Sequence, residues 1–246
     1  KETAFIPKIG GAILNTSICL GRLGANVGFL GAVSKDLFGE QILEELINSK
    51  VNTSFCLETS NNTTLAFAKI ANGTTTYSFF DENSSNRTIC LKDVVLDDSV
   101  VDTIYVGGIS LMSEPNGTEI ENFIAKESSK KIVFYDPNVR PNFIEDRSLF
   151  IQRFEKILSQ SDIIKISEED LEWLYPNGSF EEIYKQWLNL GLSIIVLTKG
   201  SEGAIIKTKN YEVTSRGEKV EVVDTIGAGD IFNGALLYSL SKHKSY

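Results

Sequence analysis

Asp224-Thr225-Ile226-Gly227-Ala228-Gly229-Asp230 is a glycine-rich stretch between a strand-like run, residues 220–223, and a helix-like run, residues 231–240. Small side chains let the backbone N–H groups of Gly227, Ala228 and Gly229 converge, and the helix dipole adds partial positive charge at the same place. The pattern predicts a strand, a tight turn and a helix start that together bind an anion, for which phosphate is the natural candidate.

Asp230 follows this turn directly. A carboxylate beside a bound phosphate is electrostatically unfavourable unless it has a chemical role, and Asp230 could take a proton from a hydroxyl while the amides hold the phosphoryl group. The alternative is that Asp230 only caps the helix and that Gly-Ala-Gly is an ordinary turn. The residues alone leave phosphoryl transfer to an alcohol and a plain cap both open.

Composition limits the class of protein. The 246 residues are 42% hydrophobic and 23% charged, which is ordinary for a globular chain with one sizeable core. A net charge of −9 argues against nucleic-acid or anionic-membrane partners, although a small anionic substrate needs only a local cationic site. No apolar stretch has membrane-spanning length and the start shows no signal-peptide core, so we expect a cytoplasmic protein without a membrane partner.

Cysteine and histidine usage narrows the chemistry further. Cys19, Cys56 and Cys90 are odd in number and far apart, which indicates reduced thiols in a cytoplasmic protein. His243 is the lone histidine and lies close to the end of the sequence. Ser-His-Asp hydrolysis, Cys-His catalysis and His-rich metal sites are therefore not expected.

Apolar strand-like runs alternate with amphipathic helix-like runs along most of the chain. Strands are expected over residues 27–33, 101–106, 132–135, 163–166 and 193–197, and helices over residues 13–23, 40–49, 119–128, 149–159, 168–175 and 180–190. This alternation predicts an α/β fold with a mostly parallel sheet covered on both faces. Ligands on such sheets gather at the carboxyl ends of the strands.

One passage has a different character. Residues 63–71 and 74–80 are rich in Thr, Phe and Tyr and flank Asn72-Gly73, the strongest short signal for a β-hairpin. Phe5–Ile9 is expected to be a further short strand. A β-ribbon inserted into an α/β chain either has a function of its own or covers a flank of the sheet.

The string DTIGAGDIFNGALL, residues 224–237, resembles the C-terminal signature of the ribokinase-like (PfkB) sugar kinase family, usually seen as DTxGAGDxFxGA. Residues 10–40 resemble the N-terminal signature of the same family. The resemblance implies a three-layer α/β/α sandwich with a mostly parallel central sheet and a small β lid. It implies one domain over residues 1–246, lacking the family's first strand and last helices, with a lid of about residues 5–9 and 52–86 that often also forms a homodimer contact.

The resemblance also implies roles around the two signatures. Asp230 would be the general base, with Gly227, Ala228 and Gly229 as an anion hole. Gly11 and Asn15 would face the sugar, because a glycine allows close approach and an amide can both donate to and accept from hydroxyls. For Asn15 the alternative is a cap at the start of a helix.

Two strand ends carry polar clusters. Asp136-Pro137-Asn138-Val139-Arg140 resembles the DPNxR motif of fructokinases and 2-keto-3-deoxygluconate kinases, in which Arg140 would meet the transferred group or the acceptor. Ser167 and Asp170 fall where the family has Asn-x-x-Glu, which organises Mg²⁺ and its waters around the nucleotide phosphates. The alternatives are a surface arginine after a turn and a solvated acidic helix start.

Further cofactor residues follow from the family pattern. Thr198, Gly200 and Gly203 resemble its Thr-x-Gly-x-x-Gly nucleotide loop. Asp224 and Ile226 occupy positions where many relatives bind a monovalent cation through side-chain and backbone oxygens, so K⁺ is an optional cofactor beside ATP and Mg²⁺.

Two passages bear on the acceptor. Residues 105–111, followed by Glu114-Pro115, are similar to a fructokinase segment written FGSISL and then EP. Asp81 stands where 2-keto-3-deoxygluconate kinases place an arginine, and it would repel a carboxylate. We therefore expect an ATP-dependent sugar kinase with fructose as its first candidate. A 2-keto-3-deoxygluconate, ribose or nucleoside kinase remains an alternative, as does a catalytically silent homologue that binds sugar or nucleotide.

Overall fold

The computed structural model describes residues 5–71, 74–221 and 225–243. It divides into two compact units, which we call unit 1 (residues 1–89 and 225–246) and unit 2 (residues 90–224). Each unit is described by itself.

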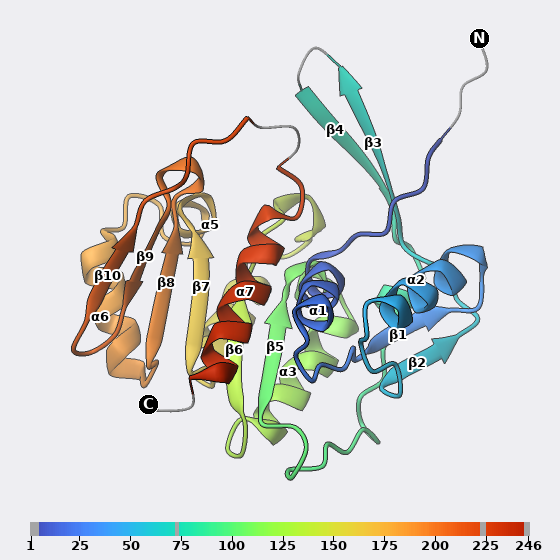
Figure 1. Ribbon diagram of the computed structural model, residues 1–246, viewed down its shortest axis with the longest axis horizontal. Coiled ribbons are helices and arrows are strands. Elements are labelled where there is room, and N and C mark those ends of the chain that lie inside the picture. The colour runs from blue at the N-terminus through green and yellow to red at the C-terminus, as the bar shows by residue number, and fades with distance from the viewer. Residues whose placement is uncertain (1–4, 72–73, 222–224, 244–246) are drawn as a thin grey trace. The chain divides into compact units, whose positions relative to one another are not determined.

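Unit 2 is built on a six-stranded sheet in the order β10-β9-β8-β7-β6-β5 (Figure 1). Its strands are β5 (Thr103–Gly107), β6 (Ile132–Asp136), β7 (Ile163–Ser167), β8 (Ile194–Thr198), β9 (Ala204–Lys207) and β10 (Glu212–Ser215). Strands β5 to β8 run parallel, whereas β9 and β10 add antiparallel strands at one edge. The expected α/β fold with a mostly parallel sheet is confirmed.

The central strands are buried on both faces. Val133, Phe134 and Tyr135 are consecutive in β6 and are each 0% exposed, and successive residues of a strand point to opposite faces. The ring of Tyr135 contacts Phe154, which in turn contacts Trp187. The helices of unit 2 are α3 (Asn116–Glu127), α4 (Arg147–Leu158), α5 (Glu168–Leu174) and α6 (Phe180–Leu190). No helix in the described part of the chain is both long enough and apolar enough to cross a bilayer.

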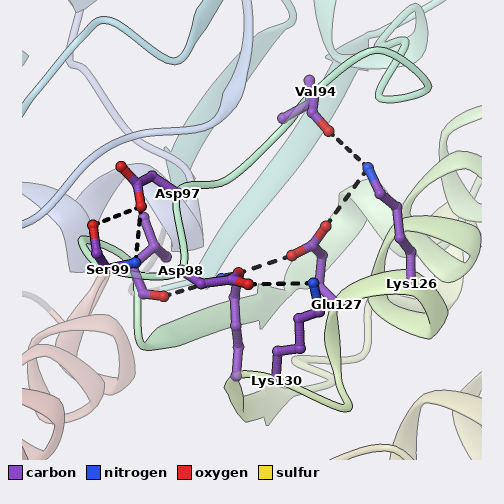
Figure 2. Close-up of polar contacts among 9 residues, drawn as sticks. Val94, Asp97, Asp98, Ser99, Lys126, Glu127 and Lys130 are labelled. Atoms are coloured by element: carbon purple, nitrogen blue, oxygen red, sulfur yellow. Dashed lines mark hydrogen bonds and ion pairs between the residues drawn. The ribbon is translucent and has the colours of Figure 1, made fainter.

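Unit 2 begins with a loop, residues 90–102, that has no helix or strand. Polar contacts fix this loop to the end of α3 (Figure 2). Lys126 Nζ donates to the backbone oxygen of Val94 at 2.9 Å, and the fully buried ammonium of Lys131 donates to Asp98 Oδ1 at 2.7 Å. These contacts hold the loop that precedes β5 in place, although the loop contains no helix or strand.

Unit 1 combines both ends of the chain. It contains α1 (Ala12–Leu23), β1 (Gly31–Ser34), α2 (Leu37–Asn48), β2 (Cys56–Thr59), the short 3-10 helix η1 (Ser85–Arg87) and α7 (Ala228–Lys242). Strands β1 and β2 pair in parallel. Leu14, Leu46 and Val51 form the buried centre of its hydrophobic core.

A separate hairpin extends from unit 1. Strands β3 (Leu65–Ala71) and β4 (Thr74–Phe80) form an antiparallel pair (Figure 1). In this pair Leu65 lies opposite Phe80, and Ala71 lies opposite Thr74. This confirms the expected β-ribbon. The Asn72-Gly73 turn on which the prediction rested lies outside the described residues.

Asp36 ties the base of this hairpin to α2. Its Oδ1 accepts hydrogen bonds from the backbone N–H groups of Phe38 and Gly39 and so caps the helix. The same carboxylate accepts the N–H and the hydroxyl of Thr63, each at 2.7 Å. Burial raises the pKa of Asp36, but the hydrogen bonds from Thr63 and Gly39 outweigh it and lower the pKa to about 2.

Three boundary predictions differ from the structure. Phe5–Ile9 forms no strand, because Pro7 lacks the N–H that a sheet ladder needs, although the ring of Phe5 packs on Phe67 at 5.2 Å. Val220 and Glu221 are not in a strand, and the rest of that expected strand lies outside the described residues. The strand expected over residues 27–33 is replaced by the shorter β1. Strands β2, β9 and β10 had not been predicted.

Candidate active site

The glycine-rich stretch forms the predicted turn at the start of α7. Gly227 is the N-cap residue with φ 80°, a left-handed conformation that favours glycine. The Ala228 N–H donates to the Thr225 oxygen at 3.2 Å, so one of the three predicted anion-hole amides bonds within its own turn. Ala228 and Gly229 are both exposed at this helix start.

Asp230, in the first turn of α7, lies directly against Asn15 of α1. Asn15 Nδ2 donates to Asp230 Oδ2 at 2.8 Å, and Asp230 is 8% exposed. A Cβ placed on Gly227 would lie 3.5 Å from Asn15 Nδ2 and 3.7 Å from Asp230 Oδ2. The structure therefore brings three predicted site residues together. Because the N-cap residue of α1 is Gly11, Asn15 is not the cap of that helix.

Gly11 is placed one turn before Asn15. Its φ of 124° is in the region that favours glycine, and its oxygen accepts the Asn15 N–H at 2.8 Å. Gly11 is exposed at the start of α1, the helix that carries Asn15.

Helices α1 and α7 pack closely enough to fix this arrangement (Figure 1). The hydroxyl of Thr16, which is 0% exposed, donates to the backbone oxygen of Asp230 at 3.0 Å. A Cβ on Gly234 would lie 2.7 Å from Cys19 Sγ, so only glycine fits at that crossing. Sequence reasoning missed Thr16 and Gly234. The available signal was that both lie within the two signature segments, residues 10–40 and 224–237.

In unit 2 the Asp136–Arg140 loop has its own anchors. Asp136 is 1% exposed, and its carboxylate accepts the Asn138 N–H at 3.2 Å and the buried ammonium of Lys165 at 3.1 Å. Asn138 has φ 42°, which asparagine tolerates better than most residues. Arg140 is exposed and donates through Nη1 to the Val139 oxygen at 2.9 Å.

Ser167 and Asp170 lie at the start of α5. Ser167 Oγ accepts the Asp170 N–H at 3.0 Å and caps the helix. Asp170 is 7% exposed, and its Oδ1 accepts the Val139 N–H at 3.0 Å. Burial, helped by the charge of Asp136, raises the pKa of Asp170, although Ser167, Lys165 and Arg140 oppose the shift. Across the described residues, no three His, Cys, Asp or Glu side chains are grouped so as to hold a metal ion.

The predicted nucleotide loop follows β8. Thr198 Oγ1 reaches the Ile166 oxygen at 3.4 Å, and Gly200 has φ 54°. Gly203 has φ 107°, and a Cβ there would lie 2.0 Å from the Ser215 oxygen, so this glycine is required for packing.

The structure describes only one of the two residues predicted to bind a monovalent cation. Ile226 is 62% exposed in the turn before α7, whereas Asp224 lies outside the described residues.

Ion pairs involve both sequence segments that bear on the acceptor. Asp81 is 6% exposed and pairs with Arg87 at 2.5 Å, so its charge is compensated and the expected repulsion of a carboxylate is not supported. Arg153, which is 3% exposed, donates to the Leu111 oxygen at 2.8 Å and binds the Glu114 carboxylate. A buried arginine, Arg153, thus binds two residues of the segment that resembles fructokinases.

Comparison with known proteins shows which family the chain resembles. Residues 3–246 match the model of the pfkB family carbohydrate kinases. The chain is 41% identical over 239 residues to a fructokinase of Rhizobium leguminosarum bv. trifolii, covering 97% of this chain and 73% of that protein.

Solved structures show the same fold. A fructokinase of Xylella fastidiosa with bound ATP superposes with a TM-score of 0.87 at 23% identity, covering 96% of this chain and 74% of that one. A fructokinase of Vibrio cholerae O395 in fructose-, ADP- and calcium-bound form gives 0.84 at 26% identity, covering 96% and 77%. The resemblance seen in the sequence is confirmed: the chain belongs to the pfkB family of carbohydrate kinases.

Proposed function

We propose that this sugar kinase transfers the γ-phosphoryl group of ATP to a hydroxyl of fructose, with Asp230 as general base. The observation that carries the proposal is the contact between Asn15 Nδ2 and Asp230 Oδ2 at the glycine turn that opens α7. The 41% identity to a protein named fructokinase supports fructose as the acceptor.

The reaction follows from the chemistry of these groups. Asp230 accepts the proton of the sugar hydroxyl as that oxygen bonds to the γ-phosphorus, and the bond from phosphorus to the bridging oxygen breaks to release ADP. The amide of Asn15 donates to one carboxylate oxygen of Asp230 and so orients the carboxylate. The N–H groups of Gly227 and Gly229, with the α7 dipole, would stabilise charge on the transferred group, and Arg140 is the predicted side-chain contributor.

Mg²⁺ fits this proposal as an ion bound mainly by the nucleotide. Magnesium usually keeps several waters and takes only one or two carboxylates together with phosphate oxygens. When bound, Mg²⁺ would neutralise phosphate charge. Ser167, Thr198, Gly200 and Gly203 remain the predicted nucleotide contacts.

The proposal also covers the domain organisation, the oligomeric state and the location of the protein. We keep the prediction of one ribokinase-like domain over residues 1–246, with a lid at about residues 5–9 and 52–86. Exposed aromatic rings support the lid and a homodimer through it: Phe5 is 75% and Phe80 62% exposed, and both contact Phe67. A cytoplasmic location and a K⁺ site at Asp224 and Ile226 stay predictions.

A coupled ADP-release assay with fructose, 2-keto-3-deoxygluconate, ribose and adenosine tests the acceptor. We expect fructose to give the highest kcat/KM. A higher value for any other acceptor would contradict the proposal. Calorimetry in parallel identifies a silent homologue, which would bind fructose and release no ADP.

A further inference from the structure

The Asp136–Arg140 loop meets α5 through one buried hydrogen bond. The Val139 N–H donates to Asp170 Oδ1 at 3.0 Å, and Val139 and Asp170 are 4% and 7% exposed. The oxygen of the same residue, Val139, accepts the Arg140 guanidinium at 2.9 Å. We infer that Asp170 is a positioning residue that fixes Arg140 through the Val139 backbone, and that this is its main role.

Asp136, the first residue of the Asp136–Arg140 loop, makes further contacts that hold this loop. Asp136 accepts the Asn138 N–H, which supports the left-handed conformation of Asn138, and the buried Lys165 ammonium holds the other Asp136 oxygen. Lys165 lies in β7, and the helix carrying Asp170 follows that strand directly. The β7–α5 segment thus supplies a cation for the first residue of the loop and an acceptor for its fourth.

The start of α5 explains why Asp170 faces inward. Three acidic residues fill the first turn, and Ser167 Oγ fixes the Asp170 N–H at 3.0 Å. Glu168 and Glu169 are exposed, whereas Asp170 is buried against Val139. A hydrated cation beside this turn would meet the two exposed glutamates more readily than a carboxylate that already accepts a backbone N–H.

The inference rests on the proposed kinase function, but one of its tests needs no turnover. Hydrogen exchange of the peptide covering residues 136–143 reports on the Val139 N–H in wild type, Asp170→Ala, Asp170→Asn and the control Glu169→Gln, which removes a neighbouring exposed carboxylate. We expect faster exchange in Asp170→Ala and unchanged exchange in Glu169→Gln. Asp170→Asn should lie between wild type and Asp170→Ala, because its amide oxygen can still accept the hydrogen bond.

Kinetics of the same variants with ATP and fructose give the second readout. Asp170→Ala should lower kcat about 10- to 100-fold with little change in the KM for fructose or in the half-saturating Mg²⁺ concentration, since a displaced Arg140 affects the transition state. Asp170→Asn should recover part of that loss. The inference is overturned if exchange of the loop is unchanged in Asp170→Ala, or if both variants raise the Mg²⁺ requirement about tenfold or more. Absence of ADP release from wild type with every acceptor would instead overturn the proposed function and leave the exchange result to decide whether the loop is anchored by Asp170.

Discussion

The two units hold their site residues in different ways. In unit 1, Asn15 and Asp230 are 215 residues apart in sequence and bond side chain to side chain, because α1 and α7 pack with Thr16 and Gly234 between them. In unit 2, Asp136 accepts hydrogen bonds from a loop N–H and from the buried ammonium of Lys165. Asp170 accepts a hydrogen bond from another N–H of the same loop.

Carboxylates of the candidate site are therefore held in place by two different kinds of contact. The unit 1 carboxylate is oriented by a side-chain amide, whereas the unit 2 carboxylates hold the backbone of a loop. Substitutions at Asn15 and Asp230 should therefore act on kcat directly, whereas those at the unit 2 loop anchors should act through loop geometry or stability.

Replacing Asp230 should have the greatest effect on catalysis. Asp230→Asn keeps the size of the side chain but removes the base, so kcat should fall about 10³-fold, or about 4 kcal/mol. The melting temperature should change little. A coupled ADP assay and a thermal melt measure both, and a wild-type rate in this variant would show that Asp230 is not the base.

The stability side of the comparison is tested by Lys165→Met. The Lys165 and Asp136 side chains are 6% and 1% exposed, so the substitution leaves a buried carboxylate without its cation and should cost about 3 kcal/mol of unfolding free energy. Lys156→Met, which breaks a more exposed pair with Glu121, is the matched control. Urea unfolding measures the difference, and equal effects of the two variants would contradict the assignment.

Acid pH tests whether the base of the hairpin is also held by a carboxylate. The pKa of Asp36 is lowered from 3.8 to about 2 in the folded protein, so its contribution is present above about pH 4 and is lost as the pH falls toward 2. That contribution is at most about 2 kcal/mol, since the side chain is partly exposed. Unfolding of wild type and Asp36→Asn should converge at low pH, and a constant gap between pH 7 and pH 2.5 would refute this role.

The smallest effect concerns the packing of α1 on α7. Thr16→Val removes one buried hydrogen bond to the Asp230 oxygen and should cost about 1 kcal/mol of stability with a several-fold loss of kcat. Ser17→Ala removes a hydrogen bond within α1, to the Ile13 oxygen, and should leave kcat unchanged. Thr16→Ser should restore the rate. Equal kinetic losses in Thr16→Val and Ser17→Ala would show that the contact with Asp230 is unimportant.

The sequence was most informative where burial forces a continuous apolar run. Strands β6, β7 and β8 were predicted because their residues are covered on both faces. Strand β10 has only exposed residues and so gave no pattern, and β2 and β9 have four residues each. Phe5–Ile9 has the apolar residues of a strand but contains Pro7.

Local signals in the sequence indicate candidate site residues but not the contacts between them. The glycine turn and Asp230 are local signals, whereas the bond from Asn15 and the support from Thr16 depend on how two distant helices pack. The direction of the Asp170 side chain depends on a loop of the neighbouring strand, so the sequence could not distinguish a metal role from a positioning role.

We propose that Asn15 and Asp230 form one catalytic unit. The most direct test is kcat with fructose and ATP for wild type, Asn15→Ala, Asp230→Asn and the double variant. If Asn15 acts through Asp230, Asn15→Ala should lower kcat about tenfold in the wild-type background and cause no further loss once Asp230 is replaced. An equal tenfold loss in both backgrounds would contradict the claim, because Asn15 would then act independently of the base.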